Sequence, residues 1–125
     1  MSDDDTTIRA LRDRIRAFVR ARDWEPFHNP KDLAGAIAIE AAELMELFLW
    51  KGSQEVAEEA RHPDSRRRVE EELADILILC LSLANQLEID ITDAVASKVV
   101  ANEAKYPTDV VRGKAHKYTH YRGDL

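Results

Sequence analysis

Residues 33–50, LAGAIAIEAAELMELFLW, decide the fold of this chain. The residues in this stretch that are not apolar are Gly35, Glu40, Glu43 and Glu46. The run shows no strand-like alternation, and a helix that is apolar nearly all round is typical of a buried helix. Pro30 or Lys31 suits its first turn, and Lys51-Gly52-Ser53 stops it. The sequence therefore predicts a buried helix over residues 30–50.

A second apolar stretch repeats this theme further along the chain. In residues 73–84, LADILILCLSLA, the only polar side chains are those of Asp75 and Ser82, and Glu72 lies one turn before Asp75. Asp64 or Ser65 could cap this helix at its N-terminus. We expect it to extend to residue 87.

Two further helices are predicted on either side of these two. Residues 6–23 carry an apolar stripe at i, i+3, i+4 and i+7 spacing, with arginines on the other face. Asp90 or Thr92 could cap another helix that ends near residue 106, and residues 54–64 favour a short helix or a loop. The expected fold is all-α and four-helix bundle-like, in a single domain of residues 1–125 with a helical core at 6–106 and a polar tail at 107–125.

Composition limits the class of function. The chain has 125 residues and a formal net charge of −6, which disfavours a nucleic-acid partner. No apolar run reaches the roughly 20 residues that span a bilayer, and the acidic N-terminus is unlike a signal peptide. The single cysteine, Cys80, cannot form an internal disulfide, so we expect a cytoplasmic protein.

Four acids in apolar surroundings form the candidate site. Glu40 and Glu43 have i, i+3 spacing, as do Glu72 and Asp75, so each pair projects from one face of its helix. Burying four carboxylates together is unfavourable unless a cation compensates their charge. Mg²⁺ prefers oxygen ligands shared between protein carboxylates and substrate phosphates. The pattern predicts a Mg²⁺ site.

Two other interpretations of these acids remain open. The acids could form ion pairs with the arginines at positions 66–68. Di-iron bundles instead use Glu-x-x-His pairs, and the chain contains Glu25-x-x-His28 and Glu59-x-x-His62. Prolines interrupt or follow both of these pairs, and neither pair lies in an apolar helix, so Mg²⁺ is preferred.

Cationic and aromatic residues are candidates for substrate binding. Lys98, Asn102 and Lys105 form one polar stripe, which is either a solvated face or a phosphate clamp. The tail adds an excess of positive charge at Arg112, Lys114, Lys117 and Arg122. His116 and His120 have helical spacing but no evident third ligand, so we interpret them as surface residues. The grouped aromatics, which suit either a core cluster or a base-stacking pocket, are Trp24, Phe27, Phe48 and Trp50.

With these residues in place, the sequence resembles the MazG-like all-α NTP pyrophosphatases, and within them the dCTP pyrophosphatase-like branch. The family signature is E-x-x-E followed by E-x-x-D, found here as Glu40-Ala-Ala-Glu43 and Glu72-Leu-Ala-Asp75. The resemblance spans roughly residues 8–119. It also includes the segments at 23–28 (DWEPFH), 43–50 (ELMELFLW), 98–102 (Lys98-x-x-x-Asn102), 105–107 (KYP) and 117–119 (KYT).

The resemblance implies a function and a set of roles. The chain would split a nucleoside triphosphate into a monophosphate and pyrophosphate, for nucleotide-pool cleansing and often on dCTP or modified pyrimidine nucleotides. Glu40, Glu43, Glu72 and Asp75 would hold Mg²⁺. Trp24, His28 and Trp50 would lie at the nucleobase, and Lys98 and Asn102 would contact phosphate or sugar. Such proteins assemble as homodimers or homotetramers with sites between subunits.

Some features of the reaction are interpretations of the residues themselves. Glu40 or Glu43 could take the proton of an attacking water, and Lys98, Lys105 and Arg112 could stabilise the leaving group. An alternative is a non-catalytic helical module that binds nucleotides or a protein.

Two positions depart from the dCTP-selective pattern. Ile15 stands where a histidine is expected, and Leu79 stands where a tyrosine is expected. Because apolar pockets discriminate weakly between substrates, base selectivity is expected to be broader here.

Overall fold

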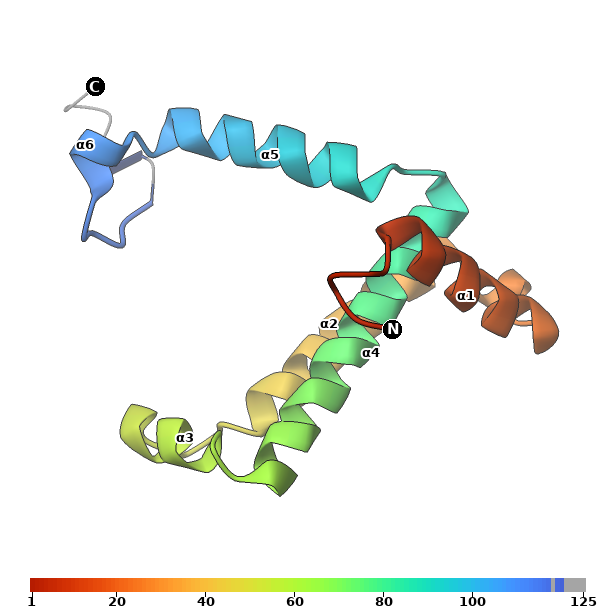
Figure 1. Cartoon of the computed structure of the whole chain (residues 1–125), viewed down its shortest axis with the longest axis horizontal. Coiled ribbons are helices and arrows are strands. Elements are labelled where there is room, and N and C mark those ends of the chain that lie inside the picture. The colour runs from red at the N-terminus through yellow and green to blue at the C-terminus, as the bar shows by residue number, and fades with distance from the viewer. Residues whose placement is uncertain (118, 121–125) are drawn as a thin grey trace. The chain divides into compact units, whose positions relative to one another are not determined.

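The structure is a computed structural model that describes residues 1–117, 119 and 120, and every secondary-structure element among them is helical. In chain order these elements are α1 (Ile8–Ala21), the 3-10 helix η1 (Glu25–Phe27), α2 (Pro30–Glu46), α3 (Ser53–Glu59), α4 (Pro63–Leu87), α5 (Ile91–Lys105) and α6 (Thr108–Val111) (Figure 1). The all-α prediction is confirmed. The chain divides into two compact units, Met1–Ile89 and Asp90–Leu125. No helix in the described part has the length and apolar character needed to cross a membrane.

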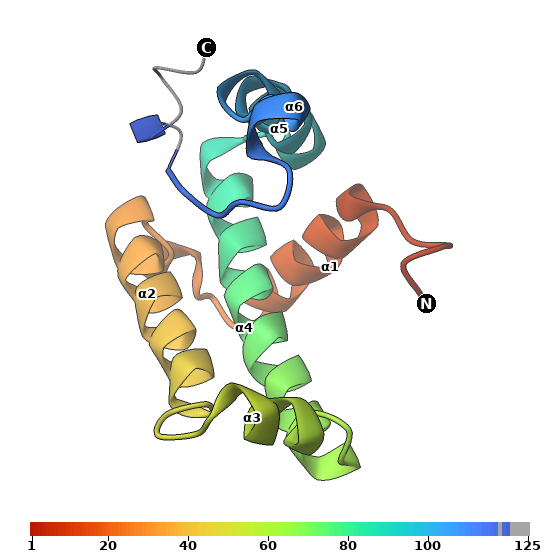
Figure 2. The same cartoon turned by 90° about the vertical axis from the view of Figure 1, so that its left-hand side faces the viewer.

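The first unit is built on the pair of helices α2 and α4. These helices lie side by side and run in opposite directions, with α3 in the connection between them, and α1 packs against α4 (Figure 2). The fully buried apolar side chains are Val19 of α1, Leu33 of α2, and Leu81 and Ala84 of α4. They lie where α1 and α2 meet α4, so the packing of the helices onto α4 forms the core.

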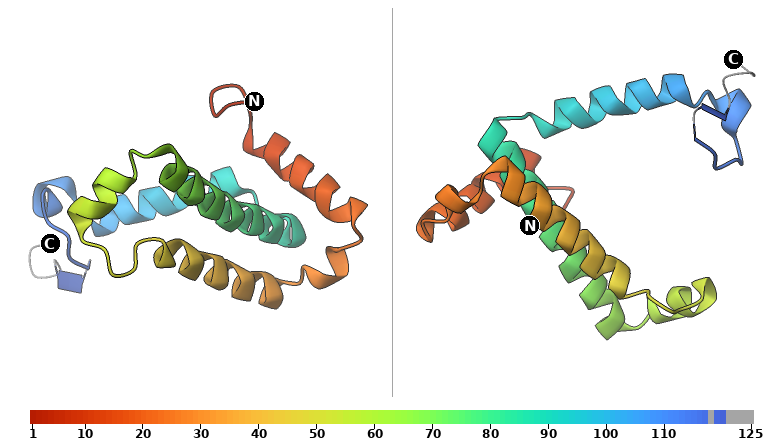
Figure 3. Two further views of the ribbon diagram at one scale, coloured as in Figure 1. Left: turned by 90° about the horizontal axis from the view of Figure 1, so that it is seen from below. Right: turned by 180° about the vertical axis from the view of Figure 1, so that it is seen from behind.

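The prediction that α2 is buried is wrong for the single chain. Leu33 is its only fully buried residue, whereas Ile39 and Met45 are each 62% exposed. The reason is geometric. The sequence of α2 is apolar nearly all round the helix, but α4 lies along only one side of it (Figure 3). The rest of its apolar surface faces outward, and such surfaces often mark interfaces.

Local sequence explains most of the helix starts. Asn29 caps α2, since its Oδ1 accepts from the backbone N–H of Asp32 at 2.9 Å, and Pro30 is the first helical residue, as predicted. Asp90 caps α5 through the N–H of Asp93 at 2.9 Å. The predicted caps of α4 are wrong because Pro63 is already helical, which its lack of an N–H favours at a first turn.

One helix end and the predicted polar tail differ from expectation, whereas the short segment before α4 agrees with it. The helix predicted to reach residue 50 ends at Glu46, and residues 47–50 continue as turns. Residues 54–64 do contain a short helix, α3. The predicted polar tail contains the four-residue helix α6.

Arg12 is an arginine that does not lie on the polar face of α1. Its side chain is only 4% exposed, and its guanidinium donates to Asn85 Oδ1 at 2.9 Å, Ile89 O at 2.7 Å and Ala84 O at 3.1 Å. Asn85 Nδ2 returns a hydrogen bond to Arg12 O at 3.1 Å. This network ties α1 to the C-terminal end of α4, where Glu88 has a left-handed backbone (φ 53°).

Candidate metal centre

The antiparallel pairing of α2 and α4 brings the predicted acids together. Glu40 and Glu43 lie on α2, and Glu72 and Asp75 lie on α4. Glu40, Glu43 and Glu72 each present a carboxylate oxygen, and these three oxygens lie within 4.8 Å of one another. Asp75 is outside this group of three, but its charge is close enough to raise the pKa of both Glu40 and Glu72.

The electrostatics of this cluster are those of crowded, partly desolvated carboxylates. Desolvation, a hydrogen bond to Glu43 and the charges of the neighbouring acids raise the pKa of Glu40 to about 7, with desolvation the largest cause. The pKa of Glu72 is also raised, first by desolvation and then by the charge of Glu43. Glu40 Oε2 and Glu72 Oε2 are buried without a hydrogen-bond partner in the described chain. Within the described residues, no ion pair compensates this negative charge.

The cluster fits a hard divalent cation. Carboxylate oxygens are the ligands that Mg²⁺ prefers, and the two unpartnered buried oxygens are groups that a cation would satisfy. A cation would also remove the repulsion that raises the pKa values. The donors of Glu40, Glu43 and Glu72 therefore suit a divalent cation, while the full set of four acids and the choice of Mg²⁺ stay predictions.

The two alternative interpretations of the acids find no support in the geometry. Arg66 pairs with Glu70 and Arg67 with Asp64, and within the described residues no ion pair joins the four acids to an arginine. The acids of the Glu-x-x-His pairs are committed elsewhere: Glu25 pairs with Arg20, and Glu59 with Lys51.

The candidate base-binding residues lie at the two ends of α2. Trp24 and His28 precede the helix, and Trp50 follows it, about 25 Å away along a helix of this length. Trp24 packs edge-to-face on Phe18, with ring centroids 5.7 Å apart. Trp50 is 94% exposed and has a left-handed backbone (φ 64°). The structure of one chain thus does not bring the two tryptophans together.

His28 contributes to a small polar cavity that was not predicted. Its Nδ1 and Ser82 Oγ are both buried without a partner among the described residues. Both residues line a cavity of about 150 Å³ with Arg16 and Arg20. From sequence, Ser82 was only a polar interruption in an apolar helix, and nothing in its spacing marked it.

The candidate phosphate-binding residues belong to the second unit. Lys98 and Asn102 are exposed on α5 at i, i+4 spacing, Lys105 ends α5, and Arg112 follows α6. His116 and His120 are exposed, as expected, and their rings stack with centroids 4.3 Å apart. Tyr118 of the KYT segment and Arg122 lie outside the described residues.

Fold and site together define an all-α protein whose facing helices carry E-x-x-E and E-x-x-D carboxylates for a divalent cation. The model of the MazG-like family matches residues 36–121. The chain belongs to the MazG-like family, which confirms the resemblance seen in its sequence.

Individual relatives agree with this membership. The chain is 41% identical over 113 residues to dCTP pyrophosphatase 1 of Rattus norvegicus and 38% identical over 113 residues to that of Homo sapiens, in each case covering 90% of this chain. It spans 66% of the length of each of these relatives. A crystal structure of a pyrophosphatase from Archaeoglobus fulgidus matches with a TM-score of 0.76 at 40% identity, over 86% of this chain and 98% of that one.

Proposed function

We propose that this chain is a Mg²⁺-dependent nucleoside triphosphate pyrophosphohydrolase, which converts a nucleoside triphosphate and water to a monophosphate and pyrophosphate. The observation that carries the proposal is the convergence of Glu40, Glu43 and Glu72 within 4.8 Å. The names of the relatives, dCTP pyrophosphatase 1 and a pyrophosphatase, support the same reaction. Its role would be nucleotide-pool cleansing in the cytoplasm, on pyrimidine deoxynucleotides such as dCTP or modified forms.

The four acids would hold Mg²⁺, which neutralises the triphosphate charge when bound. Glu40 or Glu43 takes the proton of the attacking water, since a carboxylate not fully engaged in binding the cation can serve as a general base. Lys98, Lys105 and Arg112 are the proposed source of positive charge for the departing pyrophosphate. Positioning and charge stabilisation carry most of a phosphoryl transfer, so no protein nucleophile is required.

The proposed base pocket uses Trp24, His28 and Trp50, with Asn102 at the phosphate or sugar. Its selectivity is expected to be broad, because Ile15 and Leu79 offer no hydrogen-bonding group to a base. Ile15 instead lines an apolar cavity of about 460 Å³ with Phe18 and Leu81.

A homodimer or homotetramer is the proposed working form. Exposed apolar side chains on α2 and α5 support it, including Ile39 at 62% and Val100 at 66% exposure. Association would cover these side chains. It would also let Trp24 of one subunit and Trp50 of another contribute to one pocket.

A substrate screen tests the proposed reaction directly. The purified chain is incubated with the common and damaged nucleoside triphosphates, with Mg²⁺ or with EDTA, and pyrophosphate is measured. Mg²⁺-dependent release of pyrophosphate with a matching amount of monophosphate is expected. Nucleotide binding without turnover on any substrate would favour a non-catalytic helical module instead.

A further inference from the structure

Trp50 occupies an unusual position at the end of α2. It is 94% exposed, and its backbone lies in the left-handed region at φ 64°, which an aromatic residue adopts rarely. Side-chain packing therefore does not hold the indole in place. Left-handed residues persist only where the surrounding structure over-determines them.

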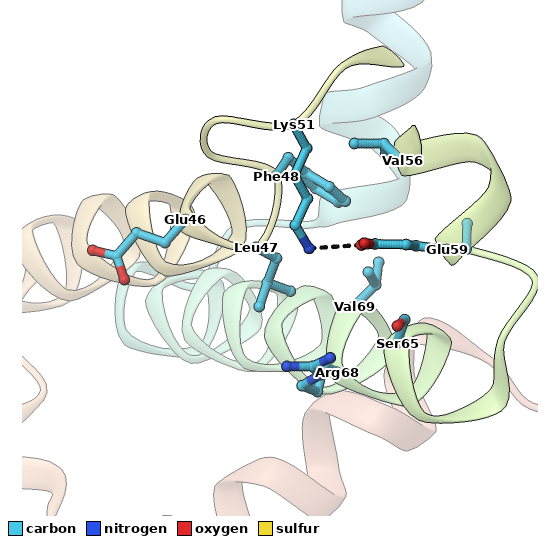
Figure 4. Close-up of a pocket in the computed structure, with 10 residues that line it drawn as sticks. Glu46, Leu47, Phe48, Lys51, Val56, Glu59, Ser65, Arg68 and Val69 are labelled. Carbon is cyan, nitrogen blue, oxygen red and sulfur yellow. Dashed lines mark hydrogen bonds and ion pairs between the residues drawn. The ribbon is translucent and has the colours of Figure 1, made fainter. Parts of the chain in front are cut away.

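The residues on the N-terminal side of Trp50 are anchored in a cavity. After α2 ends, the N–H groups of Leu47, Phe48 and Leu49 donate to carbonyls three residues earlier, at 3.0–3.2 Å. Leu47 and Phe48 then line a cavity of about 190 Å³ together with Val56 of α3 and Val69 of α4 (Figure 4). This packing fixes one side of the turn.

The residue on the C-terminal side of Trp50 is anchored by an ion pair. Lys51 extends across the same cavity, and its Nζ lies 2.6 Å from Glu59 Oε2 on α3 (Figure 4). The two side chains are 31% and 37% exposed, so the pair is more shielded than the other ion pairs of the described residues. The backbone N–H of Lys51 also donates to Phe48 O at 3.2 Å. The turn is therefore clamped on both sides of Trp50.

We infer that the Lys51–Glu59 ion pair is a positioning contact that holds Trp50 ready to receive the base of the substrate. This inference rests on the proposed function, which places Trp50 at the nucleobase. Neither Lys51 nor Glu59 needs to touch the substrate. The clamp fixes the backbone that carries Trp50 before the nucleotide arrives, so the indole can reach fewer positions and binding has less ordering to supply.

Removing the ion pair should weaken substrate binding more than the chemical step. Ordering one large side chain on binding corresponds to roughly a two- to tenfold loss of affinity. In Lys51→Met and Glu59→Gln we expect KM to rise by about that factor with kcat within about twofold, because a ground-state interaction is lost. Glu58→Gln is the matched control, since it removes the same charge from an exposed position of α3. The charge-swapped double variant, Lys51→Glu with Glu59→Lys, should restore KM.

Fluorine NMR separates this positioning role from the proposed reaction. Protein labelled with 5-fluorotryptophan contains two probes, Trp24 and Trp50, which Trp50→Phe assigns. Without nucleotide, the Trp50 signal should shift or broaden in Lys51→Met and Glu59→Gln, but not in Glu58→Gln, while the Trp24 signal stays unchanged. In the wild type, α,β-imido-dCTP with Mg²⁺ should shift the Trp50 signal.

The experiments with the ion-pair variants and with the nucleotide analogue would fail in different ways. An unchanged Trp50 signal in both ion-pair variants would overturn the positioning role, whatever the enzyme turns over. A Trp50 signal that responds to the variants but never to nucleotide would show that Trp50 is not part of the substrate site. The proposed role of Trp50 at the base would then be wrong, and the inference that depends on it would fail as well. A charge swap that leaves KM raised would show that the ion pair is not what orders Trp50.

Discussion

Replacing Arg12 with methionine should destabilise the protein, although Arg12 is not one of the acids of the candidate metal centre. Methionine keeps an apolar stem of similar length and removes the guanidinium. Ile89 O then loses its only donor among the described residues. The other two acceptors keep partners, because Ala84 O also accepts from the N–H of Ile89 at 2.9 Å and Asn85 Oδ1 from Arg16 at 3.3 Å.

The magnitude follows from this inventory of contacts. A hydrogen bond from a charged donor is worth about 1.5–3 kcal/mol. Ile89 is 38% exposed, so water can partly replace the donor that its carbonyl loses. Since two of the three acceptors retain partners, we expect a loss of about 2–4 kcal/mol in the free energy of unfolding. At roughly 3–5 °C per kcal/mol for a chain of this size, Tm should fall by about 6–20 °C.

Urea unfolding followed by far-ultraviolet circular dichroism measures this loss at a fixed protein concentration. Arg9→Met is the matched control, because Arg9 is an exposed arginine on the same helix. Arg12→Lys should fall between the wild type and Arg12→Met, since a lysine keeps the charge but cannot reach three acceptors with a planar group. If Arg12→Met is no less stable than Arg9→Met, the assignment of Arg12 as the tie between α1 and α4 is wrong.

The proposed site and assembly yield four further expectations. Asp75→Asn or Glu72→Gln should abolish turnover with helicity intact by circular dichroism; near-normal rates in either variant would refute the metal assignment. The fold raises the pKa of Glu40 from 4.5 to about 7, so the folded protein holds the proton of Glu40 more tightly than the unfolded chain does. Protonated Glu40 therefore adds its full contribution to the free energy of unfolding below pH 4.5, and this contribution is lost as pH rises through 7. In EDTA, Tm should therefore be lower at pH 8 than at pH 5, Mg²⁺ should restore it at pH 8, and Glu40→Gln should flatten the profile. Light scattering at micromolar concentration should give a dimer or tetramer, and a stable monomer would contradict the assembly. Hydrolysis in ¹⁸O-labelled water should label the monophosphate; label in pyrophosphate, or orthophosphate as first product, would place the attack at a different phosphorus.

Short-range chemistry made part of the structure predictable from sequence. The start of α2 followed from Pro30, one of two residues predicted for its first turn, and the start of α5 from Asp90, one of its two predicted caps. Such signals depend only on residues close together in sequence. The acid cluster followed from i, i+3 spacing on two apolar helices. Asp75 lies outside the group of three close carboxylates. Its position depends on how α2 and α4 pair, which the spacing of residues along one helix does not reveal.

Other features depend on contacts between distant parts of the chain. Arg12 was expected on a polar face, since helical periodicity assigns a charged residue to solvent and is blind to the carbonyls of residues more than 70 positions away. The end of α2 was placed too late because its apolar run continues into the turn that displays Trp50. The Lys51–Glu59 pair bridges a turn and a separate helix, so no single-helix pattern reveals it.

All four acids of the candidate metal centre come from α2 and α4 of the same chain. A mixed assembly of intact chains and Asp75→Asn chains would therefore contain one complete set of acids for every intact chain. Loss of activity should then follow the fraction of defective chains in direct proportion, as expected for a recessive lesion. A defect in Trp24 or Trp50 would behave differently if a pocket draws on two chains, because one altered copy would then impair its neighbour. Subunit mixing can in this way show which residues of the site come from a single chain and which come from two chains.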